Sequence, residues 1–471
     1  MKILLINTNR MKPAIAPIGL DYVADSLIEA GHEPRLLDLC FSEDVHADIE
    51  QAIRDFDPRL IGVSVRNTDE CYMSGAFFLP FVTEVVDFLR KQSDAPIVMG
   101  GVGFSVMPEA VMRFCRPDFG IAGEGEASFT RLARAITVQS GIETVPNLLY
   151  WDENTLKRTE TVHEIPGNSA RTRSLADNPR YFREGGQAGI ETKRGCDMKC
   201  VYCADPVGKG RRIRLRSPKL VVDELKCLLA QGIDHFHTCD CEFNVPGDHA
   251  KAVCREIIQS GIAESIRWFA YCSIVPFDEE MADLFKRAGC AGVDFGADSG
   301  NDDMLRRLGR EFKSADLVNT ADLCHKHGIP ILYDLLVGSP GETRETVRET
   351  IELMRRIDAD CVGLSMGVRI YEGTATANWV CGQGDIAANP DIYGAKQDNA
   401  DFLRPVFYVS PDLGGDMVDI VRELVGEDKR FFLPSREEVD SNYNYNDNTV
   451  LVRAIRDGAR GAYWDILRRM R

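Results

Sequence analysis

Three cysteines on one short segment have the residue type and the spacing of a metal-cluster site. Cys196, Cys200 and Cys203 are spaced C-x3-C-x2-C, and no fourth cysteine follows at a matching interval. Cysteine thiolates are the usual ligands of iron–sulfur clusters, and a [4Fe–4S] cubane normally takes four ligands. The segment therefore predicts a cluster with three protein ligands, in which one iron stays open to bind another molecule.

A structural zinc loop is the alternative for these cysteines. Zinc prefers four closed ligands, commonly two C-x2-C pairs or a combination of cysteine and histidine pairs. Cys239 and Cys241 could complete such a set, but C-x-C is a poor spacing for it, so the cluster is favoured. His235 and His237 share one face of a strand, but with no third ligand in the pattern they are expected to be core or barrel-lining residues.

The run Arg194–Cys203 resembles the signature of the radical S-adenosylmethionine (SAM) superfamily, including an aromatic residue, Tyr202, directly before the last cysteine. The resemblance implies that the amino and carboxylate groups of SAM chelate the open iron. It also implies that an electron from the cluster splits SAM into methionine and a 5′-deoxyadenosyl radical, and that Tyr202 packs beside the adenine.

The same resemblance assigns acidic residues at strand ends to SAM. Asp240 and Glu242 follow the second strand of the expected barrel, where relatives place acids that accept from the SAM ammonium. In the motif Gly296–Gly300, Asp298 stands where the family usually has a glutamate that binds the ribose hydroxyls, with Ser299 beside it. The alternative for Asp240 and Glu242 is a pair of solvated loop acids.

Three further positions complete the expected cofactor contacts in this half. Arg310 falls where relatives clamp the SAM carboxylate, a task that suits a planar guanidinium; its alternative is a helix-surface charge. The run Val337–Thr343 closely matches the family's fifth-strand motif, in which Gly338 lets the backbone approach adenine. Tyr271 and Ser273 share one face of the third strand, so they are expected to line the substrate cavity, with Ser273 counted among the cofactor contacts.

Residues 1–140 alternate strand and helix patterns, which predicts a doubly wound parallel sheet. The expected strands are Lys2–Asn7, Glu33–Leu39, Leu60–Val65, Pro96–Met99 and Phe119–Ala122. The expected helices are Gly19–Ala30, Ala47–Phe56, Ala76–Lys91, Pro108–Phe114 and Ser128–Ala135. In such sheets, ligands bind at the carboxyl ends of the strands.

Glycines after the fourth strand could suggest a dinucleotide site. Gly100, Gly101 and Gly103 follow that strand, whereas the G-x-G-x-x-G fingerprint should follow the first, so a nicotinamide site is rejected. The region instead resembles the cobalamin-binding domain found ahead of many radical SAM domains, through Pro17–Leu20, the glycines after strand four, and Gly123–Glu126 with its Glu124. The resemblance implies that glycines leave room for the nucleotide tail of cobalamin between the sheet and a helix.

The loops at the strand ends indicate how cobalt would be held. Many cobalamin proteins carry a histidine after the first strand, but Thr8–Ala16 has none, so cobalamin is expected to bind base-off without histidine ligation. Arg66, Asn67 and Thr68 follow the third strand and are expected to face the lower side of the corrin. For Arg66, a surface salt bridge with an acid at position 69 or 70 is an equal alternative.

The second half of the chain again alternates strand and helix. Six βα units fit the partial (β/α)6 barrel of radical SAM enzymes, in which chemistry lies at the carboxyl ends of the strands. The six strands are expected near Gly189–Lys193, His235–Cys239, Arg267–Ser273, Gly292–Phe295, Ile331–Val337 and Cys361–Val368. After about residue 386 the rhythm is lost, and two helices are expected, near Asp416–Val425 and Thr449–Arg469, in a cap that closes the barrel mouth.

The resulting organisation has four parts. Residues 1–140 form the cobalamin-binding domain, 141–185 a connector, 186–385 the radical SAM domain, and 386–471 the C-terminal cap or substrate region. The connector is expected to hold a hairpin turn at Tyr150–Asn154 and a loop at Pro166–Asn168, and the last part an asparagine- and tyrosine-rich run, Ser441–Asn448.

Composition limits the partners and the compartment. The net charge of −17 over 471 residues argues against nucleic acid and against an anionic membrane surface. No apolar run approaches the roughly 18 residues of a membrane span, and the N-terminal apolar run is too short for a signal peptide. Fifteen cysteines, most of them scattered singly, indicate a reducing compartment, so a cytoplasmic protein is expected.

Together the two resemblances imply a cobalamin-dependent radical SAM methyltransferase. It would methylate an unactivated carbon, or phosphorus, of a small metabolite through methylcobalamin and a 5′-deoxyadenosyl radical, with electrons from an external donor such as flavodoxin or ferredoxin. Rearrangement, cyclisation or ring contraction with the same cofactors is the alternative within the enzyme class. A redox-responsive binding protein is the alternative outside it, and the many SAM-contact motifs argue against that one.

Overall fold

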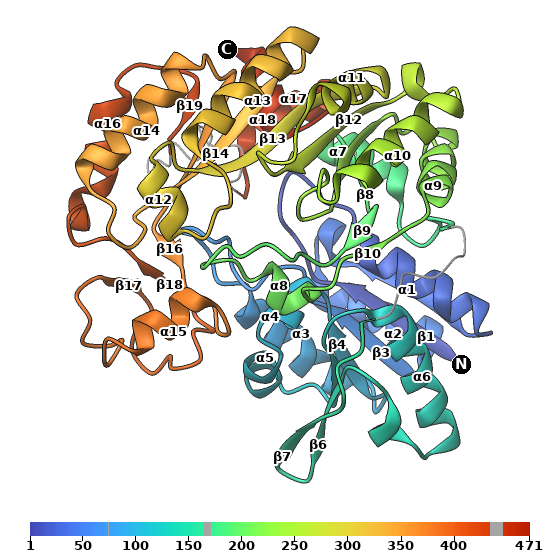
Figure 1. Cartoon of the computed structure of the whole chain (residues 1–471). Coiled ribbons are helices and arrows are strands. Elements are labelled where there is room, and N and C mark those ends of the chain that lie inside the picture. The colour runs from blue at the N-terminus through green and yellow to red at the C-terminus, as the bar shows by residue number, and fades with distance from the viewer. Residues whose placement is uncertain (74, 164–170, 434–445) are drawn as a thin grey trace.

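The computed structural model describes residues 1–73, 75–163, 171–433 and 446–471, and it has the expected α/β class (Figure 1). Two seven-stranded sheets organise the described chain. The first, at the bottom of Figure 1, belongs to the N-terminal domain, and the second, at the top, forms the partial barrel. The predicted loop Pro166–Asn168, and most of the run Ser441–Asn448, lie outside the described residues.

The first sheet has the strand order β2-β1-β3-β4-β5-β6-β7, and its first five strands are parallel. Strand β1 is buried on both faces: Ile3 and Leu5 pack toward α1 and α6, and Leu4 and Ile6 pack toward the other layer of helices. A nearly continuous apolar run is what a strand covered on both faces requires. The elements are β1 (Lys2–Asn7), α1 (Ile18–Glu29), β2 (Glu33–Asp38), α2 (Val45–Phe56), β3 (Leu60–Ser64), α3 (Leu79–Gln92), β4 (Ile97–Gly100), α4 (Val102–Val106), α5 (Pro108–Cys115), β5 (Phe119–Ile121) and α6 (Gly125–Val138).

An antiparallel hairpin extends this sheet beyond residue 140. Strands β6 (Leu148–Asp152) and β7 (Thr155–Arg158) pair with each other, and β6 pairs with β5. The predicted turn at Tyr150–Asn154 is present, and Glu153 within it adopts a left-handed backbone conformation with φ 54°. The first part of the predicted connector therefore belongs structurally to the N-terminal sheet.

The second sheet contains all six predicted barrel strands, all parallel, in the order β19-β15-β14-β13-β12-β11-β8. Helices pack on its outer face, where the largest hydrophobic core lies. The elements are α7 (Asn178–Gly185), β8 (Ala188–Ile190), β9 (Lys193–Arg194), α8 (Asp205–Lys209), β10 (Arg214–Leu215), α9 (Pro218–Ala230), β11 (His235–Thr238), α10 (Gly247–Gln259), β12 (Arg267–Cys272), α11 (Glu279–Arg287), β13 (Cys290–Asp298), α12 (Asp302–Arg307), α13 (Ser314–His327), β14 (Ile331–Val337), α14 (Arg344–Arg356) and β15 (Cys361–Met366).

The C-terminal region is divided between the two ends of the barrel. Strands β16 (Val368–Arg369), β17 (Ile392–Gly394) and β18 (Val406–Tyr408) form a small sheet beyond the carboxyl end of β15, with α15 (Ala375–Cys381) beside them, and α16 (Met417–Val425) packs on α14. The short strand β19 (Phe431–Phe432) joins the barrel sheet beside β15. The predicted helix at Asp416–Val425 is thus present.

The single helix predicted over Thr449–Arg469 is wrong. The chain forms α17 (Thr449–Arg456) and α18 (Tyr463–Met470), separated by a turn that contains Gly458 and Gly461 with φ 107° and 114°. Trp464 of α18 packs edge-on against Phe269 inside the sheet, with ring centroids 6.0 Å apart. Helix α18 therefore enters the barrel at the amino ends of the barrel strands. The sequence-based prediction had placed the whole C-terminal cap at the opposite end, over the barrel mouth.

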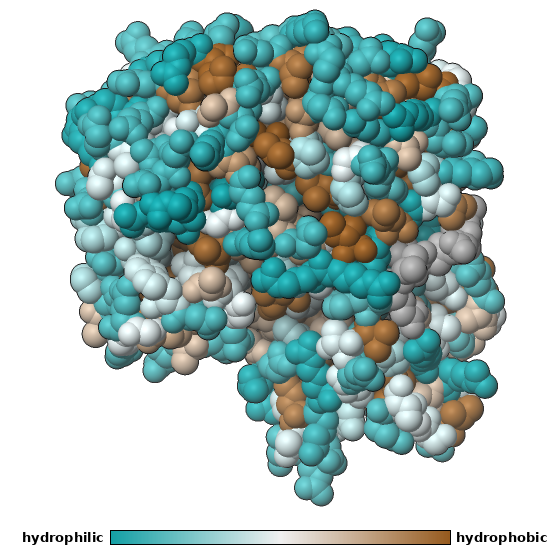
Figure 2. Space-filling view, in the orientation of Figure 1, coloured by the Kyte–Doolittle hydropathy of each residue, from teal (hydrophilic) through white to brown (hydrophobic). Residues whose placement is uncertain are grey.

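Figure 2 shows a face that is largely hydrophilic, with hydrophobic residues in small groups. No helix among the described residues is long and apolar enough to cross a membrane.

Buried ion pairs join the two domains. Arg173, fully buried between them, donates to Asp21 of α1 at 3.0 Å and to Glu224 of α9 at 2.9 Å, and Tyr22 donates to Glu224 at 2.9 Å. These charged side chains are buried away from water, and a buried charge without an ion-pair partner is energetically costly, so the pairing stabilises the folded protein. The pairs fix how the N-terminal sheet sits against the barrel.

Removing the central cation should therefore destabilise the protein. Arg173→Met leaves the buried Asp21 carboxylate without its ion-pair partner and Glu224 with Arg216 alone, and we expect a loss of about 3–5 kcal/mol in the free energy of unfolding. Urea denaturation followed by circular dichroism measures it. Arg453→Met, at a side chain that is 87% exposed, is the matched control and should change stability by less than about 0.5 kcal/mol. Equal stability of the two variants would contradict this role of Arg173.

Candidate active site

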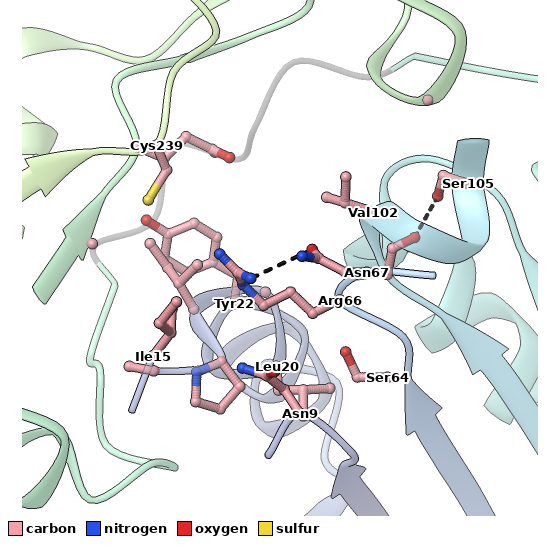
Figure 3. Close-up of a pocket in the computed structure, with 18 of the residues that line it drawn as sticks. Asn9, Ile15, Leu20, Tyr22, Ser64, Arg66, Asn67, Val102, Ser105 and Cys239 are labelled. Atoms are coloured by element: carbon pink, nitrogen blue, oxygen red, sulfur yellow. Dashed lines mark hydrogen bonds between the residues drawn. The ribbon is translucent and has the colours of Figure 1, made fainter. Parts of the chain in front are cut away.

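A cavity of about 750 Å³ lies between the carboxyl ends of the first sheet and the inside of the barrel. Figure 3 shows its two sides: Leu20 and Tyr22 come from α1, Arg66 and Asn67 from the loop after β3, and Cys239 approaches from the barrel. Parallel strands of both sheets end here, which is where α/β folds place their ligands.

The glycines on the N-terminal side of the cavity have two different structural roles. Gly100 and Gly123 line the cavity, and a side chain there would meet open space or only ordinary contacts. A Cβ on Gly101 would collide with the carbonyl of Val65, and one on Gly103 would lie 2.9 Å from the backbone of Asn67. Gly101 also lines the cavity, and the absence of a side chain at Gly101 and Gly103 lets α4 approach the loop after β3.

The loop after β3 directs two of its three predicted residues into the cavity. The Arg66 guanidinium hydrogen-bonds to Asn67, and both side chains line the cavity (Figure 3). Thr68 is buried and donates to Asp69 at 3.0 Å, so it does not line the cavity. Asp69 in turn pairs with Arg369 of the barrel at 3.0 Å. Glu70 accepts from Ala76 N–H at 2.7 Å, and among the described residues the alternative salt bridge of Arg66 with Asp69 or Glu70 is not formed.

The glycine–glutamate loop after β5 is an interface between the domains. Glu124 pairs with Arg214 and lies 3.4 Å from His163, and Glu126 pairs with Arg194 at 2.6 Å. Although burial opposes ionisation, Arg194 lowers the pKa of Glu126 to about 2. Glu124 lines the cavity, but its carboxylate is engaged by Arg214, so its main contact is the barrel rather than a cofactor.

The cysteine loop is held against the barrel mouth by backbone hydrogen bonds. Cys196 N–H donates to the Gly210 carbonyl, Val201 N–H donates to Leu308, and Thr376 N–H donates to the Val201 carbonyl. No three His, Cys, Asp or Glu side chains in the described ranges converge closely enough to hold one metal ion. Ligands of a cubane bind separate iron corners and need not converge in this way.

Cys239 and Cys241 both line the cavity, and Cys241 also lies beside the cysteine loop. A hydrogen bond from the Cys241 thiol lowers the pKa of Cys196, despite the opposing effect of burial. Lys209 Nζ is 3.6 Å from the Cys241 sulfur. The two cysteines of the C-x-C pair thus occupy different environments.

Four predicted SAM residues converge behind the cysteine loop. Arg310 is buried and not on a helix surface: its Nη1 donates to the sulfur of Cys200 at 2.8 Å, and its Nη2 is 4.0 Å from Glu242. Tyr202 donates to Asp298 at 2.7 Å, and Arg310 Nε lies 3.4 Å from the same carboxylate. Burial raises the pKa of Glu242 to about 8. The fold thereby brings the guanidinium of Arg310 and the carboxyl groups of Glu242 and Asp298 together beside the cysteine loop.

Three predicted residues have other roles in the structure. Asp240 is buried and accepts from Thr192 and Lys193, which fixes the segment that leads into the cysteine loop, so it is no solvated acid and not free for the SAM ammonium. The Ser299 hydroxyl is buried against Thr350, 3.1 Å away. Ser273 is fully buried and does not line the cavity. The structure argues against cofactor contacts for these side chains.

The fifth-strand motif is arranged as a tight turn into α14. Gly338 N–H donates to Glu342 at 2.6 Å, with φ 104° at the glycine, a conformation that favours a residue without Cβ. A Cβ on Gly338 would lie 3.0 Å from the sulfur of Met417. Thr343 caps α14 by accepting from Thr346 N–H.

Several cavity residues carry no signal that sequence reasoning used. Ser105 lines the cavity and accepts from Gly123 N–H at 2.9 Å, and it follows the glycine run closely enough to have been considered. Asp294, Tyr463 and Trp464 also line the cavity. Tyr463 and Trp464 come from α18, far along the chain, so only the three-dimensional fold reveals them.

Two family models match the chain in these same regions. The model of the B12 binding domain matches residues 5–133, and that of the radical SAM superfamily matches residues 190–354. The tryptophan 2-C-methyltransferase of Streptomyces laurentii is 31% identical over 98% of this chain and 94% of that protein. The chain belongs to the cobalamin-dependent radical SAM methyltransferases.

Solved structures of TsrM, a radical SAM methyltransferase from Kitasatospora setae, share the whole fold. The structure with tryptophan and the SAM analogue aza-SAM has a TM-score of 0.93 and 31% identity, over 99% of this chain and 97% of that one. The structure with cobalamin and a [4Fe–4S] cluster has a TM-score of 0.90 and 30% identity, with the same coverage. The predicted fold class, enzyme class and cofactor set are confirmed as those of this family.

The residues present fit these groups. The Arg310 Nε atom is buried without a hydrogen-bond partner in the described part of the chain, and it lies beside Cys200 and Asp298, where SAM would supply an acceptor. On the other side, Gly100 and Gly123 line the cavity; a Cβ at Gly123 would have nothing within 4 Å and one at Gly100 would meet only an ordinary contact, which leaves room for a bulky group at the carboxyl ends of the first sheet. The cavity reaches these glycines, and its lining includes Cys241 beside the cysteine loop.

Proposed function

We propose that this methyltransferase transfers a methyl group to a ring carbon of a small aromatic substrate of the indole class. The observation that carries the proposal is an aromatic chamber at the barrel end of the cavity, lined by Tyr271, Tyr463 and Trp464. Flat rings pack well against such side chains. Relatives named for the C-methylation and the binding of tryptophan support the same substrate class.

The residues gathered behind the cysteine loop supply the SAM site in this proposal. Cys196, Cys200 and Cys203 hold the cluster, which supplies an electron and an open iron to SAM. Arg310 pairs with the SAM carboxylate, and Glu242 accepts from its ammonium. Asp298, oriented by the hydroxyl of Tyr202, accepts from the ribose hydroxyls.

The N-terminal side supplies the cobalamin site. Gly100 and Gly123 would give the cofactor room, and Arg66 with Asn67 would line its site from the loop after β3. A guanidinium stays protonated and has no free electron pair, so Arg66 would line the cofactor site without acting as a metal ligand. Cobalamin carries the methyl group between SAM and substrate. The low-potential electron that both cofactors need comes from a donor of the flavodoxin or ferredoxin type.

Counting the products of SAM tests the proposal. The enzyme is reconstituted with cluster and cobalamin and incubated with SAM, a reductant and L-tryptophan, and products are followed by mass spectrometry. We expect methylated indole with an equivalent of S-adenosylhomocysteine. Accompanying 5′-deoxyadenosine would support the radical route inferred from the sequence, and its absence would indicate attack by the electron-rich ring carbon. 5′-Deoxyadenosine without any methylated product would contradict the proposal.

The role given to Asp298 predicts weaker SAM binding on its removal. Asp298→Ala loses charge-assisted hydrogen bonds worth about 1.5–3 kcal/mol, so the Kd for SAM should rise roughly 10- to 150-fold. Equilibrium dialysis with radiolabelled SAM measures it. Asp303→Ala, at an exposed acid on the neighbouring helix α12, is the matched control and should leave the Kd unchanged. Similar values for the two variants would remove Asp298 from the SAM site.

A further inference from the structure

A buried ion pair joins the N-terminal side of the cavity to the end of the barrel. Asp69 lies on the loop after β3, and Arg369 lies on β16, directly beyond the barrel strand β15. Arg369 donates to the Asp69 carboxylate from Nη2 at 3.0 Å and from Nε at 3.3 Å, and the two side chains are only 5% and 1% exposed. In Figure 1, β16 lies at the left and α1 at the right, so this contact is separate from the pairs around Arg173.

The loop that carries Asp69 has little regular structure of its own. Residues 65–78 connect β3 to α3, and their described positions contain no helix or strand. Asp69 organises the loop by accepting from the Thr68 hydroxyl at 3.0 Å and from Cys71 N–H at 2.8 Å. A connection of this length loses much conformational entropy when it is ordered, so its shape depends on such side-chain contacts. Arg66, which lines the cavity, lies on the same loop shortly before Asp69.

The guanidinium of Arg369 is itself fixed from the barrel side. It donates to three main-chain carbonyl groups, those of Ile370, Phe402 and Leu403, the last two at 3.1 and 3.3 Å. It also stacks on the ring of Tyr371, 4.5 Å from the ring centroid. A planar guanidinium with five N–H donors can hold several acceptors at once in this way. Arg369 is therefore a fixed anchor against which the loop is bound.

Two further contacts join the same loop to the same part of the barrel. The sulfur of Cys71 lies 2.9 Å from the hydroxyl of Tyr371. A Cβ on Gly367 would lie 2.8 Å from the sulfur of Met73, so Met73 packs on the barrel backbone at this glycine. The short segment after β15 thus contacts the loop in three places, and the ion pair is the one among them that carries charge.

We propose that Arg369 is a positioning residue for cobalamin: by binding Asp69 it keeps the loop after β3, and with it Arg66, at the wall of the cofactor site. The inference rests on the function proposed above, because it uses the cobalamin site assigned there. Arg369 is not among the described residues that line the cavity, so it acts through the loop and not on the cofactor. Without Arg369, the Asp69 carboxylate loses its ion-pair partner, and the loop must rearrange to hydrate the charge.

A double-mutant cycle with Arg66 separates this role from a general effect on stability. Full-length protein that carries its cluster but no cobalamin is titrated with hydroxocobalamin, and binding is followed by absorbance. We expect Arg369→Met to weaken binding at least about tenfold, and Arg66→Ala to weaken it as well. The absorbance spectrum of the bound cofactor should change in the same way in both variants. Because Arg369 acts through the loop of Arg66, the double variant should bind no more weakly than Arg369→Met alone, whereas independent effects would multiply.

Two further variants control for the loss of an arginine. Arg404 follows the segment that Arg369 contacts, and it donates to the carbonyls of Gln397 and Asp398 and not to the loop. Arg404→Met should therefore keep the natural Kd and spectrum. Arg369→Lys keeps a cation against Asp69 and should recover most of the affinity that Arg369→Met loses.

Each outcome supports or overturns the inference. Natural affinity in Arg369→Met, or losses that multiply in the double variant, overturns it while the cobalamin site stands. If Arg369→Met does not fold, as judged by circular dichroism, Asp69→Asn takes its place in the cycle with the same expectations. Undiminished binding by Arg66→Ala would show that the loop does not contact cobalamin, which overturns the proposed site and the inference together. Failure of the proposed substrate class leaves these titrations unchanged, because they contain no substrate.

Discussion

Replacing Cys196, Cys200 and Cys203 together with alanine is expected to remove the cluster and abolish methyl transfer. Anaerobically reconstituted natural protein should carry about four irons and four sulfides at this site, and the triple variant close to none. The physical reason is that these thiolates are the only ligands the loop offers, and the backbone hydrogen bonds of Cys196 and Val201 hold the loop at the barrel mouth. Iron and sulfide analysis and product detection measure the two losses.

The control for this experiment uses cysteines away from the cavity. Cys227 on α9 and the exposed Cys381 on α15 can be replaced together with alanine, and we expect full iron content and activity. Cys241 needs its own single variant, because its thiol hydrogen-bonds to Cys196 and could compete for iron. A complete cluster in the triple variant would show that other residues are the ligands.

The fold could be predicted well because local pattern and global architecture agree. Strands such as Lys2–Asn7 and Ile331–Val337 are apolar runs of the right length between helical patterns, and the structure reproduces both ranges. Such runs suit a parallel sheet covered on both faces. The C-terminal region lacked this consistency. The glycines at 458 and 461 divide the expected helix, and nothing local indicates that Trp464 enters the barrel.

The site was predictable in position but not in orientation. The sequence placed Asp240, Glu242, Asp298 and Ser299 at strand ends, and all four lie there. Which of them face the cofactor depends on the twist of each strand end and on competing donors. The backbone N–H groups of Thr192 and Lys193, for example, donate to the Asp240 carboxylate and so occupy it. Contacts between domains were equally invisible, because a partner such as Arg214 for Glu124 lies 90 positions away.

Omitting cobalamin should abolish methyl transfer without weakening SAM binding. The SAM residues Arg310 and Asp298 lie on the barrel, and the glycines that line the cobalamin side lie on the N-terminal sheet, so each site can form without the other cofactor. We expect protein that carries its cluster but no cobalamin to form no methylated product, with a Kd for SAM within about twofold of that of the holoenzyme. Formation of methylated product by this cobalamin-free protein would contradict the proposal that the N-terminal domain binds the cofactor that carries the methyl group.

Filling the cobalamin side from the protein should have the same effect. Gly100 lines the cavity, and the nearest atom to a Cβ there is the Ile121 carbonyl oxygen at 3.5 Å, an ordinary contact, so Gly100→Leu should fold and place its side chain where the cofactor needs room. We expect at least about a hundredfold weaker cobalamin binding by absorbance titration, with iron content unchanged. Gly415→Leu introduces the same side chain at a position with nothing within 4 Å, away from the cavity, and should bind cobalamin normally. Undiminished binding by Gly100→Leu would place the cofactor elsewhere in the molecule, because a leucine and the corrin cannot share that volume.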